Sequence, residues 1–184
     1  MTKEQKKIFV VDDALTSLTA CKNVLKPYYE VFPAPTAAKM FELLSHVKPD
    51  IILLDVDMPD INGYEAAGML KRDEATKDIP IIFLSGRVDP KSEIFGLNMG
   101  ALDYIHKPFV SELLLKRIET HLSLIEHQKM LEEQNKSILT MRTPLNEIIN
   151  LLDYAIANED PVKSREYAEK AKNGALNFLN IFAK

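Results

Sequence analysis

The sequence is poor in cysteine and has no long apolar run. Its single cysteine, Cys21, excludes an internal disulfide, and its helical phase with Leu18 and Leu25 predicts a buried, unreactive thiol. No stretch approaches the length of a membrane-spanning helix, and the charged N-terminal segment MTKEQKK lacks the apolar region of a signal peptide. We therefore expect a cytoplasmic protein that does not enter a membrane.

The sequence also lacks an excess of positive charge and a glycine-rich phosphate loop. Lys and Arg number 23 against 27 Asp and Glu, and both signs are spread evenly along the chain, which argues against a nucleic-acid-binding surface. Without a glycine-rich loop, the chain is not expected to hold ATP itself. Its 184 residues suffice for one domain with an appendage or for two small domains.

The first part of the chain alternates short apolar runs with segments of helical spacing. The runs are nearly continuous and rich in Ile and Val, which is typical of parallel strands covered on both faces. We expect strands at 8–11, 51–54 and 79–84, weaker strands near 29–33 and 102–105, and helices at 14–26, 36–47, 63–74 and 89–98. This order predicts an α/β fold with a doubly wound sheet of five parallel strands.

From Val110 onward the strand signal disappears and the apolar residues follow a heptad pattern. One series consists of Leu124, Leu131, Ile138, Leu145 and Leu152, and a second, offset by three, of His127, Gln134, Met141, Ile148 and Ala155. The pattern stops before Asp160, which suits a helix N-cap, and Pro161, which suits the first position of a new helix. That helix carries its own stripe, made of Ala168, Ala171, Ala175, Phe178 and Phe182.

A helical hairpin on a long stalk is the structure that this second part predicts. One hairpin with one apolar stripe per helix cannot enclose a core, and the simplest partner for such a surface is another copy of the chain. We therefore expect a homodimer through residues 121–184, in which two hairpins form a four-helix bundle. The alternative is that the helices fold back onto the α/β domain, but heptads that lead away from that domain favour the dimer.

Polar side chains stand at the ends of four of the five expected strands. Asp12 and Asp13 follow the first strand, Asp55 ends the third, Ser85 ends the fourth, and Lys107 follows the fifth. Because ligands of open parallel sheets bind at the carboxyl ends of the strands, these side chains are expected to converge on one crevice. Taken singly, each has an ordinary explanation as a helix cap, a turn residue or a solvated lysine.

Together, these side chains suit phosphoryl transfer. Three carboxylates placed close together repel one another and are stabilised by a hard divalent cation, for which Mg²⁺ is the common cellular choice. The Asp55 carboxylate is then placed to attack a phosphorus atom. The metal, the Lys107 ammonium and the Ser85 hydroxyl would neutralise charge on the phosphoryl oxygens.

Four sequence blocks, FVVDD, ILLDVDMPDINGYE, IFLSG and GALDYIHKPF, resemble the signature of the response-regulator receiver domain of two-component signalling, in the same order and spacing. The resemblance covers roughly residues 6–120 and implies a flavodoxin-like receiver domain over residues 1–120. It further implies a sensor histidine kinase or a phosphotransfer protein as the partner. The chain is therefore expected to be a response regulator of a phosphorelay.

The same resemblance implies a role for each site residue. Asp55 corresponds to the phosphoryl acceptor, and Ser85 and Lys107 to the groups that bind the phosphoryl oxygens. Asp12, Asp13, Asp55 and the backbone carbonyl of Asp57 correspond to the Mg²⁺ ligands. Tyr104 corresponds to the switch aromatic, with a half-buried strand aromatic as the alternative, and the Lys107-Pro108 peptide bond is expected to be cis.

A phosphatase of the haloacid-dehalogenase type is a rival interpretation of the block LLDVDMP. That family also has an Asp-x-Asp pair after a strand, in which the second Asp is a general acid and base. Its motif continues with Thr or Val, whereas here the fifth position is Pro59. The acidic pair Asp12 and Asp13 also precedes the nucleophile instead of following it, so the receiver is the favoured interpretation.

The expected hairpin resembles the dimerisation and phosphotransfer hairpin of sensor histidine kinases through the string Arg-Thr-Pro-Leu-Asn. Aligned on this string, the acceptor His position holds Leu139, which cannot accept a phosphoryl group. Thr143 corresponds to a residue that orients water for dephosphorylation, so a degenerate hybrid kinase or fragment with phosphatase activity is an alternative. Simple packing beside Pro144 is the other explanation of Thr143, and it is favoured. His121 and His127 are expected to be solvated or to lie in the seam.

Overall fold

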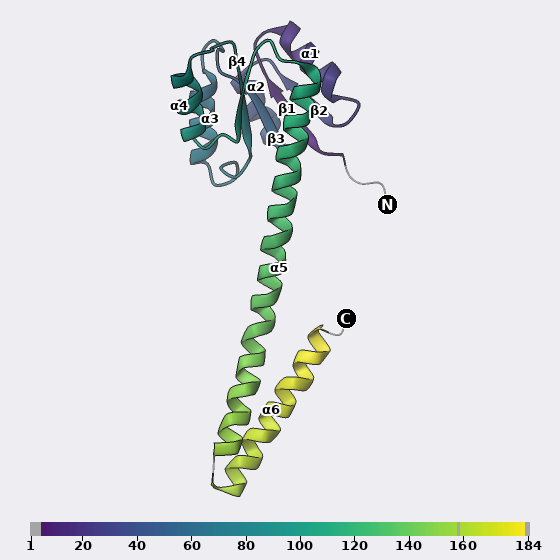
Figure 1. Cartoon of the computed structure of the whole chain (residues 1–184), viewed down its shortest axis with the longest axis vertical. Coiled ribbons are helices and arrows are strands. Elements are labelled where there is room, and N and C mark those ends of the chain that lie inside the picture. Colours follow the sequence, from purple (N-terminus) through teal and green to yellow (C-terminus); the bar gives the residue numbers. More distant parts are fainter. Residues whose placement is uncertain (1–4, 158, 183–184) are drawn as a thin grey trace. The chain divides into compact units, whose positions relative to one another are not determined.

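The computed structural model describes residues 5–157 and 159–182, and the chain divides into two compact units between Leu124 and Ile125. In the described part of the first unit, five strands form one parallel sheet in the order β2-β1-β3-β4-β5 (Figure 1). The strands are β1 (Lys7–Val11), β2 (Glu30–Ala34), β3 (Ile51–Asp55), β4 (Ile81–Ser85) and β5 (Asp103–His106). The doubly wound sheet that the sequence predicts is thereby confirmed.

Helices cover both faces of this sheet. They are α1 (Leu15–Leu25), α2 (Ala37–Leu44), α3 (Gly63–Arg72), α4 (Pro90–Asn98) and the beginning of α5 (Ser111–Ala157). Along β1, Phe9 and Val11 pack in a cluster with α2 and α3, while Ile8 and Val10 pack in a second cluster with α1 and α5. Because successive strand side chains point to opposite faces, a strand covered on both sides has no polar positions, which explains the continuous apolar runs.

The element boundaries differ from the expected ones by a few residues. The strand expected from residue 79 begins at Ile81, and the carbonyl of the preceding Pro80 accepts a hydrogen bond from Ile52 N (2.9 Å). The helix expected over 36–47 ends at Leu44, and Thr36 is its N-cap, accepting from Lys39 N. Boundaries of this kind depend on caps and turns, which a periodicity defines poorly.

Cys21 lies within the cluster between the sheet and α1, fully buried, as its helical phase predicts. Burial raises the pKa of its thiol to about 12, with the nearby Asp12 acting in the same direction. A thiol in this state holds its proton and reacts slowly. Among the described residues, no helix combines the length and the apolar character needed to cross a membrane.

The second unit is a helical hairpin formed by the C-terminal part of α5 and by α6 (Pro161–Phe182). As expected, α6 starts at Pro161, and the Asp160 side chain accepts a hydrogen bond from Val162 N (2.9 Å). The two helices meet through small residues. Ala155 and Ala171 are buried, and a Cβ placed on Gly174 would lie 3.2 Å from Ile148 Cγ1.

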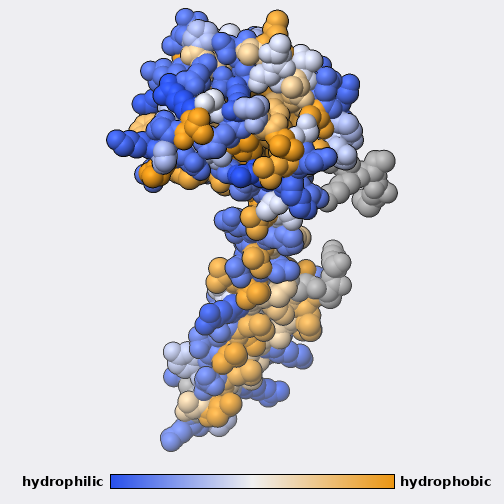
Figure 2. Space-filling model, turned by 45° about the horizontal axis from the view of Figure 1, so that its top comes forward, coloured by the Kyte–Doolittle hydropathy of each residue, from blue (hydrophilic) through white to orange (hydrophobic). Residues whose placement is uncertain are grey.

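Only one of the two heptad series packs inside the hairpin. Ile148 and Ala155, of the offset series, are at least partly buried, whereas Leu145 and Leu152 keep 42% and 44% of their surface exposed. The helix runs unbroken through Pro144. Figure 2 shows apolar side chains lying open on the surface of the hairpin. The helix α6 therefore does not cover the leucine series.

One histidine differs from its expected environment. His121 was expected to be solvated or to lie in the heptad seam, but its side chain is 19% exposed, and its Nε2 lies 3.2 Å from Asp103 Oδ2. The same carboxylate accepts two hydrogen bonds from Arg117, at 2.9 and 2.8 Å. His121 thus belongs to the first unit, because it lies one helical turn beyond Arg117 on the face of α5 toward β5.

Candidate functional site

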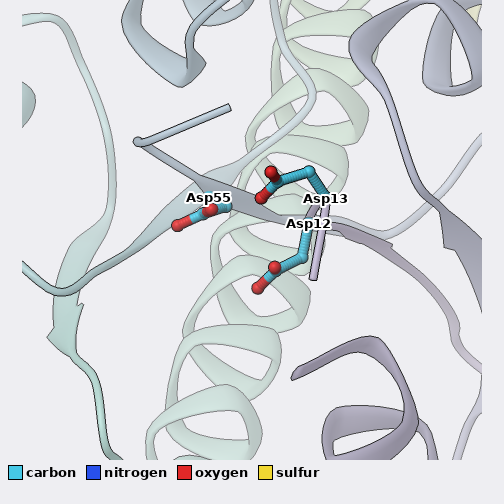
Figure 3. Close-up of side chains that lie close together, drawn as sticks. All are labelled: Asp12, Asp13 and Asp55. Carbon is cyan, nitrogen blue, oxygen red and sulfur yellow. The ribbon is translucent and has the colours of Figure 1, made fainter. Parts of the chain in front are cut away.

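Three carboxylates meet where the strand order reverses between β1 and β3. Asp12 and Asp13 directly follow β1, and Asp55 is the last residue of β3. Each offers an oxygen within 4.8 Å of the others, and Figure 3 shows the three side chains gathered at the ends of their strands. Asp12 and Asp55 are buried, whereas Asp13 is exposed. Closely placed carboxylate oxygens are the donor set that a hard cation such as Mg²⁺ prefers, so the residues present fit a metal.

A lysine lies within hydrogen-bonding distance of two of these carboxylates. Lys107 Nζ donates to Asp12 Oδ2 at 2.6 Å and to Asp55 Oδ1 at 2.7 Å. Lys107 follows β5, its backbone N–H donates to Ser85 O (2.7 Å), and its peptide bond to Pro108 is cis, as expected. Lys107 therefore places a positive charge from the end of β5 next to carboxylates at the ends of β1 and β3.

Burial and charge act against each other on these groups. Burial raises the pKa of Asp55, the neighbouring Asp12 and Asp13 add to the rise, and the Lys107 ammonium opposes it. For Lys107, burial lowers the pKa, but the hydrogen bonds to Asp12 and Asp55 and their charges outweigh burial, so its pKa lies above its usual value. The site therefore holds a charged ammonium beside a carboxylate that an additional positive charge would stabilise.

The loop after Asp55 is held by a close backbone approach. A Cβ on Gly63 would lie only 2.1 Å from the carbonyl oxygen of Asp55, so no other residue type fits there without moving the loop. Gly63 N also donates to Val56 O (2.9 Å). The following helix, α3, starts with a capping box between Asn62 and Glu65. This arrangement fixes the backbone that carries Asp55.

Ser85 ends β4, beside β3, and is fully buried. Its Oγ accepts a hydrogen bond from Arg87 N at 2.9 Å. The side chain of Asp57 does not join the carboxylate cluster among the described residues, because it pairs with Arg87, whose Nε lies 2.8 Å from Asp57 Oδ1. Its backbone carbonyl is the group that the receiver resemblance assigns to the metal.

Three further residues of the site were not found from the sequence. Ser17, on α1, donates a hydrogen bond from its hydroxyl to Asp12 Oδ2. Arg87 pairs with Asp57, and Tyr64, on α3, has its hydroxyl 3.4 Å from that of Tyr104. These contacts join different secondary-structure elements, and no local pattern indicates them.

Tyr104 lies in β5 and is 2% exposed, so it is buried rather than half-buried. Tyr64 Oη donates to Ser92 O at 3.0 Å, and its hydrogen bond partner Tyr104 therefore acts as the donor to it. A Cβ on Gly96 of α4 would lie 3.2 Å from the Tyr104 ring. Tyr104 therefore packs closely against α4.

The residues that the sequence singles out on the hairpin lie away from the carboxylates in sequence and on a separate unit. Leu139, at the position of a kinase histidine, is 62% exposed. Thr143 is also exposed, one residue before Pro144 in α5. In the described part of the chain, three-residue groups suited to a metal occur only at the three aspartates.

Known proteins share the first unit. The family model "Response regulator receiver domain" matches residues 8–119. A probable cyclic di-GMP phosphodiesterase of Vibrio cholerae is 35% identical over 133 residues, which make up 72% of this chain and 30% of that protein. Protein PilH of Pseudomonas aeruginosa is 32% identical over 118 residues, 64% of this chain and 98% of PilH. The chain spans about half of the length of further relatives, such as PhoB of the same organism.

Solved structures agree with this assignment. A CheY-like response regulator receiver domain protein from Methanospirillum hungatei superposes with a TM-score of 0.63 at 28% identity, covering 68% of this chain and 99% of that one. The family match does not favour the haloacid-dehalogenase alternative. From the match over residues 8–119 and the relatives that share it, this chain belongs to the response regulator receiver family.

Proposed function

We propose that this chain is a response regulator that accepts a phosphoryl group on Asp55 with the help of Mg²⁺. The observation that carries the proposal is the Lys107 ammonium, which lies between Asp12 and Asp55 in a cluster of three carboxylates at the point where the strand order reverses. An ordinary surface salt bridge would not join three strand ends around buried carboxylates. Receiver domains interact with histidine kinases or phosphotransfer proteins, and we propose such a protein as the donor.

The chemistry proposed for Asp55 is a nucleophilic displacement. An oxygen of its carboxylate forms a bond to phosphorus as the bond between phosphorus and the donor's leaving group breaks, and the leaving group keeps the electron pair. The result is an acyl phosphate on Asp55. Mg²⁺, held by Asp12, Asp13, Asp55 and the Asp57 carbonyl, would supply positive charge to the phosphoryl oxygens.

The other side chains have separate roles in this proposal. Lys107 would transfer its hydrogen bond from the Asp55 carboxylate to a phosphoryl oxygen, and the Ser85 hydroxyl would donate to another while it still accepts from Arg87 N. When Ser85 moves, Tyr104 on the neighbouring strand β5 would change its side-chain position. Tyr104 contacts α4 through Tyr64 and Gly96, which gives the change a route to the surface.

The output proposed for residues 121–184 is dimerisation. The leucine series that α6 leaves uncovered, with Leu131, Ile138, Leu145 and Leu152, is between 42% and 60% exposed. On α6, Leu176 and Leu179 are 49% and 58% exposed. Apolar surface of this extent on two adjacent helices is stabilised when a second hairpin covers it, and four helices can enclose a common core.

We further propose that the hairpin carries no phosphotransfer chemistry. Leu139 has no nitrogen that could take a phosphoryl group, and its side chain is exposed. The phosphatase alternative depends on Thr143 alone, and an exposed threonine on a helix needs no catalytic role to explain it. The hairpin is thus an interaction surface whose access or geometry would change with the state of the receiver.

The test is incubation of the whole chain with acetyl phosphate and Mg²⁺, followed by intact-protein mass spectrometry. The wild-type protein should gain the mass of one phosphoryl group, and Asp55→Asn should gain none. The gain should disappear when the metal is chelated. A wild-type protein that stays unmodified, or an Asp55→Asn variant that is modified normally, would refute the proposed function.

A further inference from the structure

An ion pair borders the carboxylate cluster without belonging to it. Arg87 Nε and Nη2 both donate to the same oxygen, Oδ1, of Asp57, at 2.8 and 2.5 Å. Both side chains are about half exposed, at 52% for Arg87 and 44% for Asp57. Exposed pairs of this kind contribute little to stability, so stability alone does not account for this one.

The backbone of Arg87 is anchored on both sides, which fixes where its side chain begins. Its N–H donates to Ser85 Oγ at 2.9 Å, and its carbonyl accepts from His106 Nδ1 at 2.9 Å. His106 pairs in register with Ser85 across β4 and β5. Replacement of the Arg87 side chain therefore leaves the anchoring groups, which belong to the backbone, in place.

The pair lies close enough to the cluster to act on it electrostatically. Asp57 is two residues beyond Asp55, a stretch of chain that spans at most about 7 Å. Arg87 is two residues beyond Ser85 at the end of the adjacent strand β4. At such distances a unit charge in partly exposed surroundings is only partly screened by salt.

The charge at this end of the sheet is net negative, and Arg87 makes it less so. Three carboxylates and the single ammonium of Lys107 leave the cluster negative. The Asp57 carboxylate adds another negative charge beside it, and Arg87 cancels that charge. A negative cluster attracts a cation but repels a phosphodonor, which is itself an anion.

Building on the proposed function, we propose that the Arg87–Asp57 pair sets the charge at the mouth of the site, with Arg87 as a positioning residue that masks the Asp57 carboxylate. Masking keeps this carboxylate turned away from the metal, so that only the backbone of Asp57 is offered to it. It also lowers the repulsion that an anionic donor meets. The pair thus balances metal affinity against reaction with the donor.

A change of charge at this pair should alter Mg²⁺ affinity and the rate of phosphorylation in opposite directions. A purely structural role would not produce this result. Arg87→Ala should tighten Mg²⁺ binding about threefold and slow phosphorylation by acetyl phosphate at saturating Mg²⁺ about three- to tenfold at low ionic strength. Asp57→Asn should weaken Mg²⁺ binding and speed phosphorylation. Damage to the fold would weaken both processes together.

The experiment is a double-mutant cycle on the whole chain with Arg87→Ala, Asp57→Asn and the combined variant. Isothermal titration measures Mg²⁺ affinity, and mass spectrometry measures the rate of phosphorylation. The combined variant should return to within about twofold of the wild type in both measurements, and the single effects should shrink at high salt. Arg87→Lys, which keeps the charge, should resemble the wild type.

Lys39→Ala is the matched control, because it removes one positive charge from an exposed pair with Glu42 on α2. It should change neither measurement. Single variants that alter both measurements in the same direction, or not at all, would overturn the inference while leaving phosphorylation of Asp55 intact. If the wild type binds Mg²⁺ and the Mg²⁺ cycle closes as expected but no phosphoryl group is gained, the proposed function fails. The effect of the pair on Mg²⁺ affinity then stands, and its effect on the donor is overturned.

Discussion

Lys107 Nζ lies 2.7 Å from Asp55 Oδ1 and is the positive partner of a carboxylate that burial disfavours in its ionised form. The two residues are 52 positions apart and lie at the ends of two strands that are separated by β4. Only the parallel order of the sheet brings them together. We therefore expect the stability of this end of the sheet and its proposed chemistry to depend on the same pair.

Removal of this ammonium should destabilise the metal-free protein. Lys107→Ala would leave Asp12 and Asp55 buried without their counter-ion, and we expect the free energy of unfolding to fall by about 2–4 kcal/mol. Mg²⁺ should stabilise this variant more than the wild type, since a cation can replace the lost charge. Urea unfolding with and without Mg²⁺ measures both effects. Equal stabilisation of the two proteins by Mg²⁺ would contradict the expected role of Lys107.

The network at β5 should give a defined acid dependence. Although burial alone would raise the pKa of Asp103, the hydrogen bonds from Arg117, Tyr104 N and His121 lower it overall. A carboxyl with a lower pKa in the folded state stabilises the fold above its unfolded pKa, near 3.9, and loses that contribution as the pH falls through the folded value. Asp103→Asn should thus cost about 1 kcal/mol at pH 7 and less in acid.

Thermal unfolding of the wild type and of Asp103→Asn, measured from neutral pH down to acid pH, checks this prediction. The difference in stability between the wild type and Asp103→Asn should narrow as the pH falls below the usual pKa of an aspartate. Arg117→Gln should show the same narrowing, because it removes the main partner of that carboxylate. A difference that stays constant with pH would mean that the charge of Asp103 contributes nothing.

The strands and the strand-end groups were accessible from the sequence for a physical reason. A strand covered on both faces has no polar positions, so Ile51 to Leu54 stand out as an apolar run, and the polar residue that ends it is then conspicuous. Asp55, Ser85 and Lys107 were found in this way. Their placement needs only the parallel order of the strands.

Contacts between side chains on different secondary-structure elements could not be predicted from the sequence. The pairing of Arg87 with Asp57 and that of His121 with Asp103 join residues 30 and 18 positions apart. A solvated surface arginine and a bonded one look the same in a sequence, because both stand among polar neighbours. Likewise, heptad spacing cannot tell which of two series packs on α6, since small residues such as Ala171 and Gly174 decide that face.

The proposed dimer should depend on the exposed leucines and not on the packing inside the hairpin. Light scattering of the whole chain at micromolar concentration should give about twice the monomer mass of 20.9 kDa, and residues 1–120 should be monomeric. Leu145→Glu combined with Leu152→Glu should give a monomer with unchanged helix content. Asn150→Glu, an exposed polar position on the same helix, is the matched control and should remain dimeric. A monomeric whole chain would refute the dimer.

Thr143→Ala separates an interaction surface from a phosphatase remnant. If the hairpin is only a binding surface for another protein chain, Thr143→Ala should not change the lifetime of the Asp55 phosphate or of the phosphate on a partner receiver. If the hydroxyl oriented a water molecule, its loss would remove one hydrogen bond of about 1–3 kcal/mol from the transition state and lengthen that lifetime severalfold. We expect no change, measured by the decay of the phosphorylated species in an intact dimer.

Mapping the position of the phosphoryl group tests the proposed function most directly. After reaction of the whole chain with acetyl phosphate and Mg²⁺, borohydride reduces an acyl phosphate to the corresponding alcohol, and peptide mass spectrometry then locates the changed residue. The change should lie at Asp55 alone and should be absent without Mg²⁺. A modification at Asp12, Asp13 or Asp57, or an unchanged peptide around Asp55 in protein that has gained a phosphoryl group, would contradict the assignment of Asp55 as the acceptor.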